Sequence, residues 1–253
     1  KTAIINIDDP WSNHFMVASN APVITYGIEK DGSWKAEQVQ VTADGVQYVV
    51  DDMPVQLHLN GNFNVYNSLA ALAVGEALGF PVADVIKALE QVPGIAGRFQ
   101  KVESDKDYTV IVDYAHTPDG LENVISTAKA FAEGRVITVF GCGGDRDRTK
   151  RPLMGKVAAK LSNYCVVTSD NPRTEDPEQI LADILPGVQE YMTKTAYTVE
   201  ADRRKAISFA IAMAQPGDVV LLAGKGHENY QEINGVKHHF DDYEVALEAM
   251  QVK

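Results

Sequence analysis

The chain has 253 residues, of which 45% are hydrophobic and 23% are charged, which is usual for globular proteins and excludes a mainly disordered or low-complexity chain. Its formal net charge of −12 disfavours nucleic acid or an anionic membrane as partner, because both recruit proteins through positive charge. Two cysteines without zinc or CxxC spacing, no apolar run of about 20 residues and no signal-peptide pattern predict a reduced, cytoplasmic protein.

The first part of the chain contains short apolar runs separated by turn signals. Strands are expected at 3–7, 23–26, 35–41 and 46–50, and the last three predict a small antiparallel sheet. Alanine and leucine at helical spacing then predict two helices, at 64–78 and 82–91. The segment 93–97, rich in Pro and Gly, reads as a linker, so we expect one domain over 1–97 and a second over 98–253.

After Arg98 the pattern alternates regularly between β-branched runs and helical segments. Strands are predicted at 108–112, 135–140, 163–168, 195–199 and 218–223. Helices are predicted at 118–132, 151–161, 177–190, 202–214 and 242–250, the third beginning with Asp176 as N-cap and Pro177 as first helical residue. This alternation predicts an α/β fold: a Rossmann-like, mostly parallel sheet covered on both faces, preceded by a partial α/β domain.

Four polar sequences each follow directly on a predicted strand of this sheet. Because the carboxyl ends of parallel strands share one edge, where ligands bind, we expect all four to face one cleft. They are Asp113-Tyr114-Ala115-His116, Gly141 to Arg146, Ser169 to Arg173, and Gly224 to Glu228.

The glycine-rich sequence and the turn after it could bind charged groups of a ligand. Backbone amides over Gly141 to Arg148, with Arg146, Arg148, Lys150 and Arg151, suit carboxylate or phosphate oxygens. A glycine turn with solvated charges is the alternative. Asp170-Asn171-Pro172-Arg173 offers an acceptor, an amide and a guanidinium that could clamp a ligand with both ammonium and carboxylate groups, whereas an ordinary β-turn explains the first three residues equally well.

The remaining candidates have equally plain alternatives. Lys225, His227 and Glu228 could contact a charged substrate or simply form a strand-exit turn. His116 is the candidate catalytic residue, as acid, base or ligand of a magnesium-bound group, or else a structural histidine. Asn64 and Asn67, three residues apart on one helix face, could contact adenine or could cap the helix.

Taken together, these motifs resemble the Mur ligases, most closely the members that add meso-diaminopimelate. The matching segments occur in family order and run from about residue 61 nearly to the end of the chain. They are Gly61 to Asn67, Gly97-Arg98-Phe99, Asp113 to Asp119, Gly141 to Arg148, Asp170 to Arg173 and Gly224 to Glu228.

The resemblance implies a cytoplasmic peptidoglycan-synthesis ligase that uses ATP and Mg²⁺. In the family, ATP phosphorylates the D-glutamyl carboxylate of UDP-MurNAc-L-Ala-D-Glu, and an amino group of meso-diaminopimelate attacks the acyl phosphate. Carried over, the residues implied to hold meso-diaminopimelate are Arg146, Asp170, Asn171, Pro172, Arg173, Gly224 and Glu228, with Arg173 on the distal carboxylate. Those implied to contact the adenosine of ATP are Asn67, Arg98 and Asp113, with Asn64 and His116 as further candidates.

The sequence also departs from the family pattern. It contains no GxxxxGK[ST] phosphate loop, UDP-substrate domain or modified lysine of the kind the family uses for magnesium, so we expect it to lack ligase activity alone and to work with further segments of the same protein. A non-catalytic module that binds a diamino acid is the alternative. A nicotinamide-dependent oxidoreductase is disfavoured, because Arg146 stands where a dinucleotide fingerprint needs its third glycine.

Overall fold

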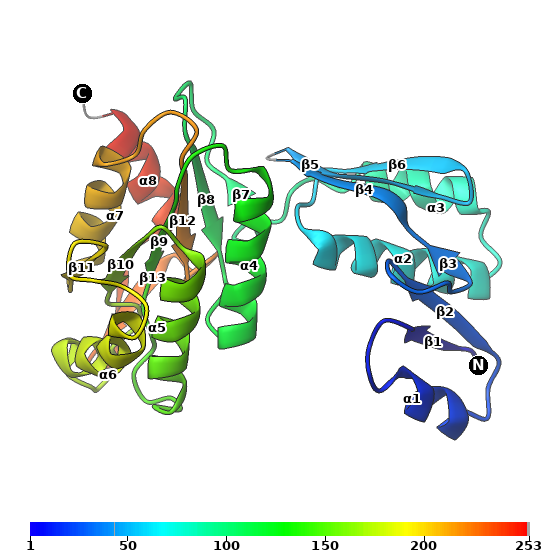
Figure 1. Cartoon of the computed structure of the whole chain (residues 1–253), viewed down its shortest axis with the longest axis horizontal. Coiled ribbons are helices and arrows are strands. Elements are labelled where there is room, and N and C mark those ends of the chain that lie inside the picture. The colour runs from blue at the N-terminus through cyan, green and yellow to red at the C-terminus, as the bar shows by residue number, and fades with distance from the viewer. Residues whose placement is uncertain (43, 252–253) are drawn as a thin grey trace. The chain divides into compact units, whose positions relative to one another are not determined.

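The computed structural model describes residues 1–42 and 44–251 and divides into two compact units, Lys1–Gly94 (unit 1) and Ile95–Lys253 (unit 2) (Figure 1). Unit 1 has one cluster of buried apolar residues, and unit 2 has two, one on each face of its main sheet.

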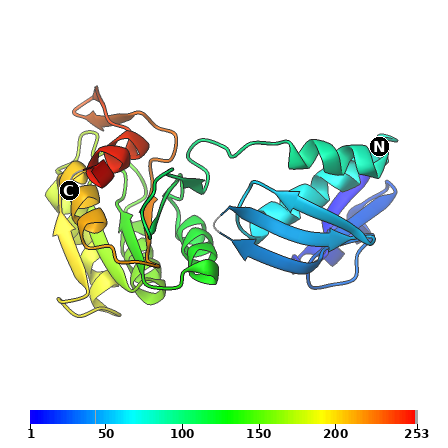
Figure 2. The same ribbon diagram turned by 90° about the horizontal axis from the view of Figure 1, so that it is seen from above.

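Unit 1 contains two small three-stranded sheets. The parallel sheet consists of β1 (Ala3–Asn6), β2 (Val23–Gly27) and β3 (Trp34–Lys35). The antiparallel sheet consists of β4 (Glu37–Thr42), β5 (Gly45–Val50) and β6 (Met53–Leu57), the blue arrows in front in Figure 2. The helices are α1 (Ser12–Ala18), α2 (Asn62–Ala77) and α3 (Val82–Glu90).

The expectation of one antiparallel sheet over 23–50 is therefore wrong in part. The strand at residue 23 pairs in parallel with β1, and α1 lies in the crossover connection that such pairing needs. The run expected as one strand over 35–41 breaks at Ala36 and contributes a strand to each sheet. Helix α2 packs its buried Val65, Leu69 and Leu72, at helical spacing, into the unit's core.

Unit 2 is built on a six-stranded sheet of order β11-β10-β9-β12-β8-β7, in which only the edge strand β7 runs antiparallel. Its strands are β7 (Gln100–Lys101), β8 (Thr109–Asp113), β9 (Val136–Phe140), β10 (Tyr164–Thr168), β11 (Tyr197–Glu200) and β12 (Val219–Ala223). Its helices are α4 (Pro118–Phe131), α5 (Lys150–Leu161), α6 (Pro177–Gln189), α7 (Arg203–Ala212) and α8 (Asp242–Gln251). The predicted α/β fold with a mostly parallel sheet is confirmed.

Helices cover both faces of this sheet, as the continuous apolar runs in its strands require. Residues of α4, α5 and α6 pack on one face, and those of α7 and α8 pack on the other (Figure 1). Side chains of Thr117, Asp176 and Asp202 cap the first turns of α4, α6 and α7, so the predicted helix start at Asp176 is confirmed.

A buried ion pair joins the amino-terminal turns of α7 and α8. Arg203 and Asp242 are fully buried, and the guanidinium donates to both carboxylate oxygens at 2.8 and 2.6 Å. A second, exposed pair between Arg204 and Glu248 links the same two helices.

A hairpin that was not predicted follows the sheet. It consists of β13 (Tyr230–Ile233) and β14 (Val236–His239), joined through Asn234-Gly235, both with positive φ, the residue pair that tight hairpins favour. Within the described part of the chain, no helix is both long and apolar enough to cross a bilayer.

Candidate functional site

The strand order of unit 2 brings the ends of four adjacent parallel strands, β8, β12, β9 and β10, to one edge of the sheet. A cavity of about 360 Å³ opens there, and residues from all four predicted polar sequences line it. The expectation that these sequences face one cleft is confirmed. The predicted site residues in its lining are His116, Arg146, Asp170, Asn171, Arg173, Gly224 and Glu228.

The glycine-rich loop after β9 lies directly against the turn after β10. The Gly144 N–H donates to the Asn171 carbonyl oxygen at 2.9 Å, and a Cβ on Gly144 would lie 1.9 Å from the Pro172 carbonyl oxygen. Only glycine permits this approach. Pro172 itself does not line the cavity but packs against this loop, and its contact with a ligand stays a prediction.

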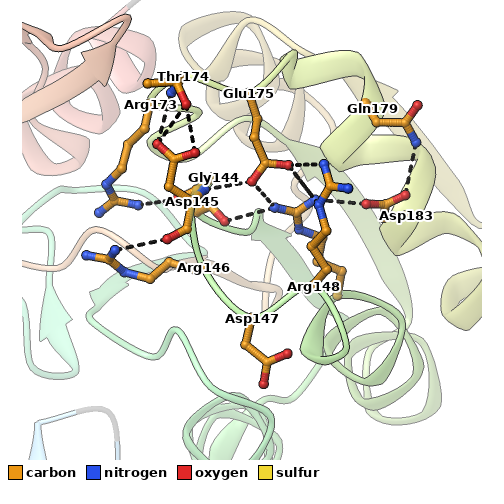
Figure 3. A network of polar contacts seen from close by, with 12 residues as sticks. Gly144, Asp145, Arg146, Asp147, Arg148, Arg173, Thr174, Glu175, Gln179 and Asp183 are labelled. Atoms are coloured by element: carbon orange, nitrogen blue, oxygen red, sulfur yellow. Dashed lines mark hydrogen bonds and ion pairs between the residues drawn. The ribbon is translucent and has the colours of Figure 1, made fainter.

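A polar network fixes both segments from behind (Figure 3). The Asp145 carboxylate accepts from the backbone N–H and hydroxyl of Thr174, while the Asp145 N–H donates to Glu175 Oε1 at 2.6 Å. Asp145 and Arg173 both adopt left-handed backbone conformations, with φ of 54° and 52°. Such conformations are costly for residues other than glycine and persist where surrounding contacts impose them.

Glu175 is the centre of this network. It accepts from Arg151, whose side chain is buried, and from Arg148, and these hydrogen bonds lower the pKa of Glu175 to about 2. Arg151 also donates to Asp183 at 2.8 Å. Arg148 and Arg151 are thus paired with Glu175, although Arg151 also lines the cavity, and their binding of ligand oxygens stays a prediction. Arg146 is exposed at the cavity.

The turn after β10 is tied to the loop after β12. Asn171 is buried, its Nδ2 donating to Glu228 Oε2 at 2.8 Å and its Oδ1 accepting from the Glu232 N–H at 2.9 Å. Arg173 donates from Nη1 to the Gly144 carbonyl oxygen at 2.8 Å and lies 3.4 Å from a Glu232 carboxylate oxygen. The guanidinium of Arg173 and the carboxylate of Glu228 therefore line the same cavity from different loops.

Gly224 and Lys225 occupy tight positions in the loop after β12. Gly224 has a φ of 120°, and a Cβ there would lie 3.0 Å from Asp170 Oδ2. Lys225 is fully buried and is not part of the cavity lining, which agrees with the structural alternative for this residue. Cys142 does line the cavity, but burial raises the pKa of its thiol to about 12, which makes a thiolate nucleophile unavailable at neutral pH.

The residues expected near adenosine are distributed over both units. Asn64 and Asn67 lie in unit 1, where Asn67 Nδ2 donates to Asn64 Oδ1 at 3.1 Å and Asn64 Nδ2 donates to the Asn60 carbonyl at 2.8 Å. The helix there is capped by neither, since its N-cap is Gly61. The two side chains lie on one helix face, as their spacing predicts.

In unit 2, Arg98 and His116 gather around one tyrosine. The Arg98 guanidinium lies 4.9 Å from the Tyr114 ring centre, and the rings of His116 and His227 lie 4.6 and 5.2 Å from it. Exposed Arg98 and these rings form a set of stacking and cationic groups whose chemistry suits a nucleotide.

Asp113 is buried beside this group and does not line the cavity. Its two carboxylate oxygens each accept a backbone N–H at 2.7 Å, one from Phe99 and the other from Ala115, while burial raises its pKa. It therefore fixes the backbone on either side of the group. For magnesium the described residues offer no cage: across 1–42 and 44–251, no three His, Cys, Asp or Glu side chains gather to hold a metal ion.

Several residues of the site carry no signal in the sequence. They are Glu175, Glu232 and the buried Lys225. Their roles arise from contacts between segments that are far apart in the chain, which no local spacing reveals. The Asn234-Gly235 turn signal could have located the hairpin that supplies Glu232.

Two family models match the chain: the Mur ligase middle domain over residues 1–75, and the Mur ligase, glutamate ligase domain over residues 97–226. The chain is 48% identical, over 99% of its length, to the UDP-N-acetylmuramoyl-L-alanyl-D-glutamate--2,6-diaminopimelate ligase of Syntrophomonas wolfei, and it covers 52% of that protein. It is also 48% identical to the ligase of the same name from Clostridioides difficile, matching 98% of the chain and 52% of that protein. The chain thus spans about half the length of the curated relatives it matches.

The chain is also similar to solved structures of Mur ligases. A structure of UDP-N-acetylmuramoyl-L-alanyl-D-glutamate--2,6-diaminopimelate ligase superposes with a TM-score of 0.68 at 39% identity, over 99% of this chain and 53% of that one. MurF from Acinetobacter baumannii superposes with a TM-score of 0.71 at 18% identity, over 99% of this chain and 51% of that one, which is a likeness of fold.

Proposed function

Since this chain belongs to the Mur ligase family, we propose that it is the part of a diaminopimelate-adding ligase that binds the incoming amino acid and contributes to the adenosine site. The complete reaction would join meso-diaminopimelate to UDP-MurNAc-L-Ala-D-Glu in cytoplasmic peptidoglycan synthesis. Mur ligases use ATP, which makes the D-glutamyl carboxylate reactive toward an amine. The UDP-linked substrate and further segments of the same protein are the partners this proposal requires.

The observation that carries the proposal is the charge arrangement of the cavity. Arg146 and Arg173 contribute guanidinium groups to its lining, and Asp170 and Glu228 contribute carboxylates. Meso-diaminopimelate carries two ammonium and two carboxylate groups, so it requires both signs of charge within one small cavity. Arg173 is proposed to bind the distal carboxylate, because that group distinguishes this ligand from L-lysine and a planar guanidinium binds carboxylates in two-point fashion.

The remaining assignments follow from position and chemistry. Arg146, Asp170, Asn171, Gly224 and Glu228 would orient the amino acid so that an amino group faces the reactive carbonyl. Arg98 and His116 would contact the nucleotide beside Tyr114, while Asp113 would act by holding that backbone in place. Asn64 and Asn67 are proposed to contact the adenosine part from unit 1. Magnesium is assigned no ligand among the described residues.

Calorimetric titration of the chain with meso-diaminopimelate and, separately, with L-lysine at equal ionic strength tests the proposal. We expect saturable binding of the first ligand and at least tenfold weaker binding of the second, a difference of about 1.4 kcal/mol. Equal affinity for both would contradict the role of Arg173, and absence of binding to either would contradict amino-acid recognition by this chain.

The second candidate is a diamino-acid-binding module without catalysis, in which the same charged cavity would bind the amino acid without further chemistry. An assay with ATP, meso-diaminopimelate and the UDP-linked dipeptide separates the two. We expect the isolated chain to bind the amino acid without forming product, and to form product once combined with a phosphate-loop segment. Continued inactivity of that combination would favour the module.

A further inference from the structure

We propose that Lys225 is a positioning residue, whose buried ammonium holds Asn171 and Glu228 in the orientation that recognises an amino-acid ligand. This inference rests on the proposed function for the nature of the ligand. It concerns a residue that does not line the cavity and therefore acts through its neighbours.

The ammonium of Lys225 lies behind the cavity, among three of the residues proposed to bind the ligand. Its Nζ is 3.1 Å from Asn171 Oδ1, 3.4 Å from Glu228 Oε2 and 3.5 Å from Asp170 Oδ1. The side chain is fully buried, so these contacts exchange little with water. Removal of one partner from such a buried group leaves the others unpaired, which is costly.

The chemistry of the ammonium determines which way the Asn171 amide faces. An ammonium can only donate, so it must meet the amide oxygen, as the Glu232 N–H also does. The amide nitrogen is thereby directed to Glu228 Oε2 at 2.8 Å. With the amide reversed, an NH₂ group would face the ammonium and a backbone N–H, both of them donors.

The same ammonium selects one oxygen of Glu228. Lys225 and Asn171 both contact Oε2, and no hydrogen bond to Oε1 occurs within the described residues, so Oε1 remains available to a ligand ammonium. A carboxylate held in this way is already oriented before the ligand arrives, which reduces the entropy lost on binding.

Lys225 also offsets like charges behind the cavity. Lys225 lies within 3.5 Å of both Asp170 and Glu228. The buried Arg203, paired with Asp242, also interacts electrostatically with these two carboxylates. Two cations against three carboxylates leave this cluster one negative charge in excess, which suits a ligand ammonium. Without Lys225, Asp170 and Glu228 would both lose the cation that lies within 3.5 Å of them.

The test compares Lys225→Met, which removes the charge at similar length, with the exposed control Lys160→Met on α5. The first measurement needs no ligand: the side-chain amide signals of Asn171 in a ¹⁵N NMR spectrum, identified by their loss in Asn171→Ala. We expect them to shift in Lys225→Met and to stay unchanged in Lys160→Met. Lys225→Gln, which keeps a donor, should move them less.

The second measurement is calorimetric affinity for meso-diaminopimelate. Lys225→Met should bind at least tenfold more weakly than the parent chain, whereas Lys160→Met should bind equally. Because Lys225 acts through Asn171, the double variant Lys225→Met/Asn171→Ala should be within about threefold of the weaker single variant, far from the product of the two losses.

The outcomes separate this inference from the function it rests on. Shifted Asn171 signals with no ligand binding by the parent chain would support positioning and contradict the proposed function. Unshifted signals, or a Lys225→Met variant that binds as well as the parent, would overturn positioning and leave the function intact. Unfolding of both Lys225→Met and Lys225→Gln would assign Lys225 to stability alone and also overturn the inference.

Discussion

At the scale of single residues, the conformation of Arg173 depends on contacts to a hairpin far along the chain. Its left-handed backbone is held by hydrogen bonds in which its N–H donates to the Glu232 carbonyl and its own carbonyl accepts from the Asn234 N–H. The side chain then reaches back to the Gly144 carbonyl. The hairpin thus helps to place the Arg173 guanidinium in the cavity, although neither β13 nor β14 contributes to the cavity lining.

Replacement of Arg173 by Ala is expected to weaken meso-diaminopimelate binding by roughly 2 to 5 kcal/mol, because a ligand carboxylate would lose its charged partner within the cavity. Calorimetric titration measures this loss. Arg173→Lys retains the charge without the planar guanidinium, so its affinity for meso-diaminopimelate should lie between those of Arg173→Ala and the parent chain. Unchanged affinity in Arg173→Ala would show that the guanidinium takes no part in ligand recognition.

Replacement of Gly144 by Ala is expected to destabilise unit 2 by about 1 to 3 kcal/mol, because the new Cβ would overlap the Pro172 carbonyl oxygen and force the two loops apart. Denaturant unfolding followed by circular dichroism measures this change. Gly94→Ala is the matched control, since a Cβ at Gly94 meets no atom within 4 Å. Equal stability of the two variants would show that the loops separate without cost.

At the scale of elements, α7 and α8 are joined by one buried and one exposed ion pair, whose contributions to stability can be compared. Asp242→Ala should cost about 3 to 5 kcal/mol of unfolding free energy, because it leaves the buried Arg203 guanidinium without its partner. Glu248→Ala, which breaks the exposed pair with Arg204 on the same helices, should cost less than about 1 kcal/mol. Urea unfolding of both variants tests this difference, and similar losses would contradict it.

The contact of the glycine-rich loop with the turn before α6 should depend on pH through Glu175. The pKa of Glu175 is lowered from 4.5 to about 2, so its stabilising contribution is fully present above pH 4.5 and is lost as the pH falls toward 2. Glu175→Gln should therefore be less stable than the parent chain at neutral pH, and the gap should narrow below pH 4.5. Urea unfolding across this range measures the gap, and Glu190→Gln, in an exposed pair with Lys156, is the control.

The elements that could be predicted are those with strong local patterns. The buried runs of β8, β9, β10 and β12 and the helices between them lie close to their expected positions, because alternation of apolar strands and helices is encoded locally. Helix α1 was missed because it is only 7 residues long and its apolar residues, Phe15, Met16 and Val17, are consecutive rather than at helical spacing. Of the β13–β14 hairpin, β14 is exposed throughout and has no alternating burial.

The site could be located but not assembled from the sequence. Polar residues after parallel strands indicated the correct edge of the sheet, because that geometry is general. The partners of those residues were not predictable, since Glu175 joins Arg151 and Lys225 joins Asn171 only after the loops have met. The sequence left direct ligand contact and a structural role open for Lys225 and Arg151. Burial gives each of them protein partners, which no local pattern encodes.

At the scale of the whole molecule, each unit has a core of its own. The buried apolar cluster of unit 1 draws on residues between Trp34 and Ile86, and the two clusters of unit 2 draw on residues from Phe99 onward. We therefore expect a polypeptide of residues 95–253 to fold alone, with a single cooperative transition in differential scanning calorimetry, and to retain affinity for meso-diaminopimelate. A broad transition without a cooperative peak would contradict this.

The place of β12 in the sheet has a consequence for synthesis on the ribosome. This strand is the last of the six to be translated, yet it lies between β8 and β9, which do not pair with each other. Until residues 219–223 have emerged, the nascent chain can form only two separate strand groups, each with an unpaired edge. Such edges recruit other chains, so a nascent or prematurely terminated polypeptide ending before β12 should depend most on chaperones.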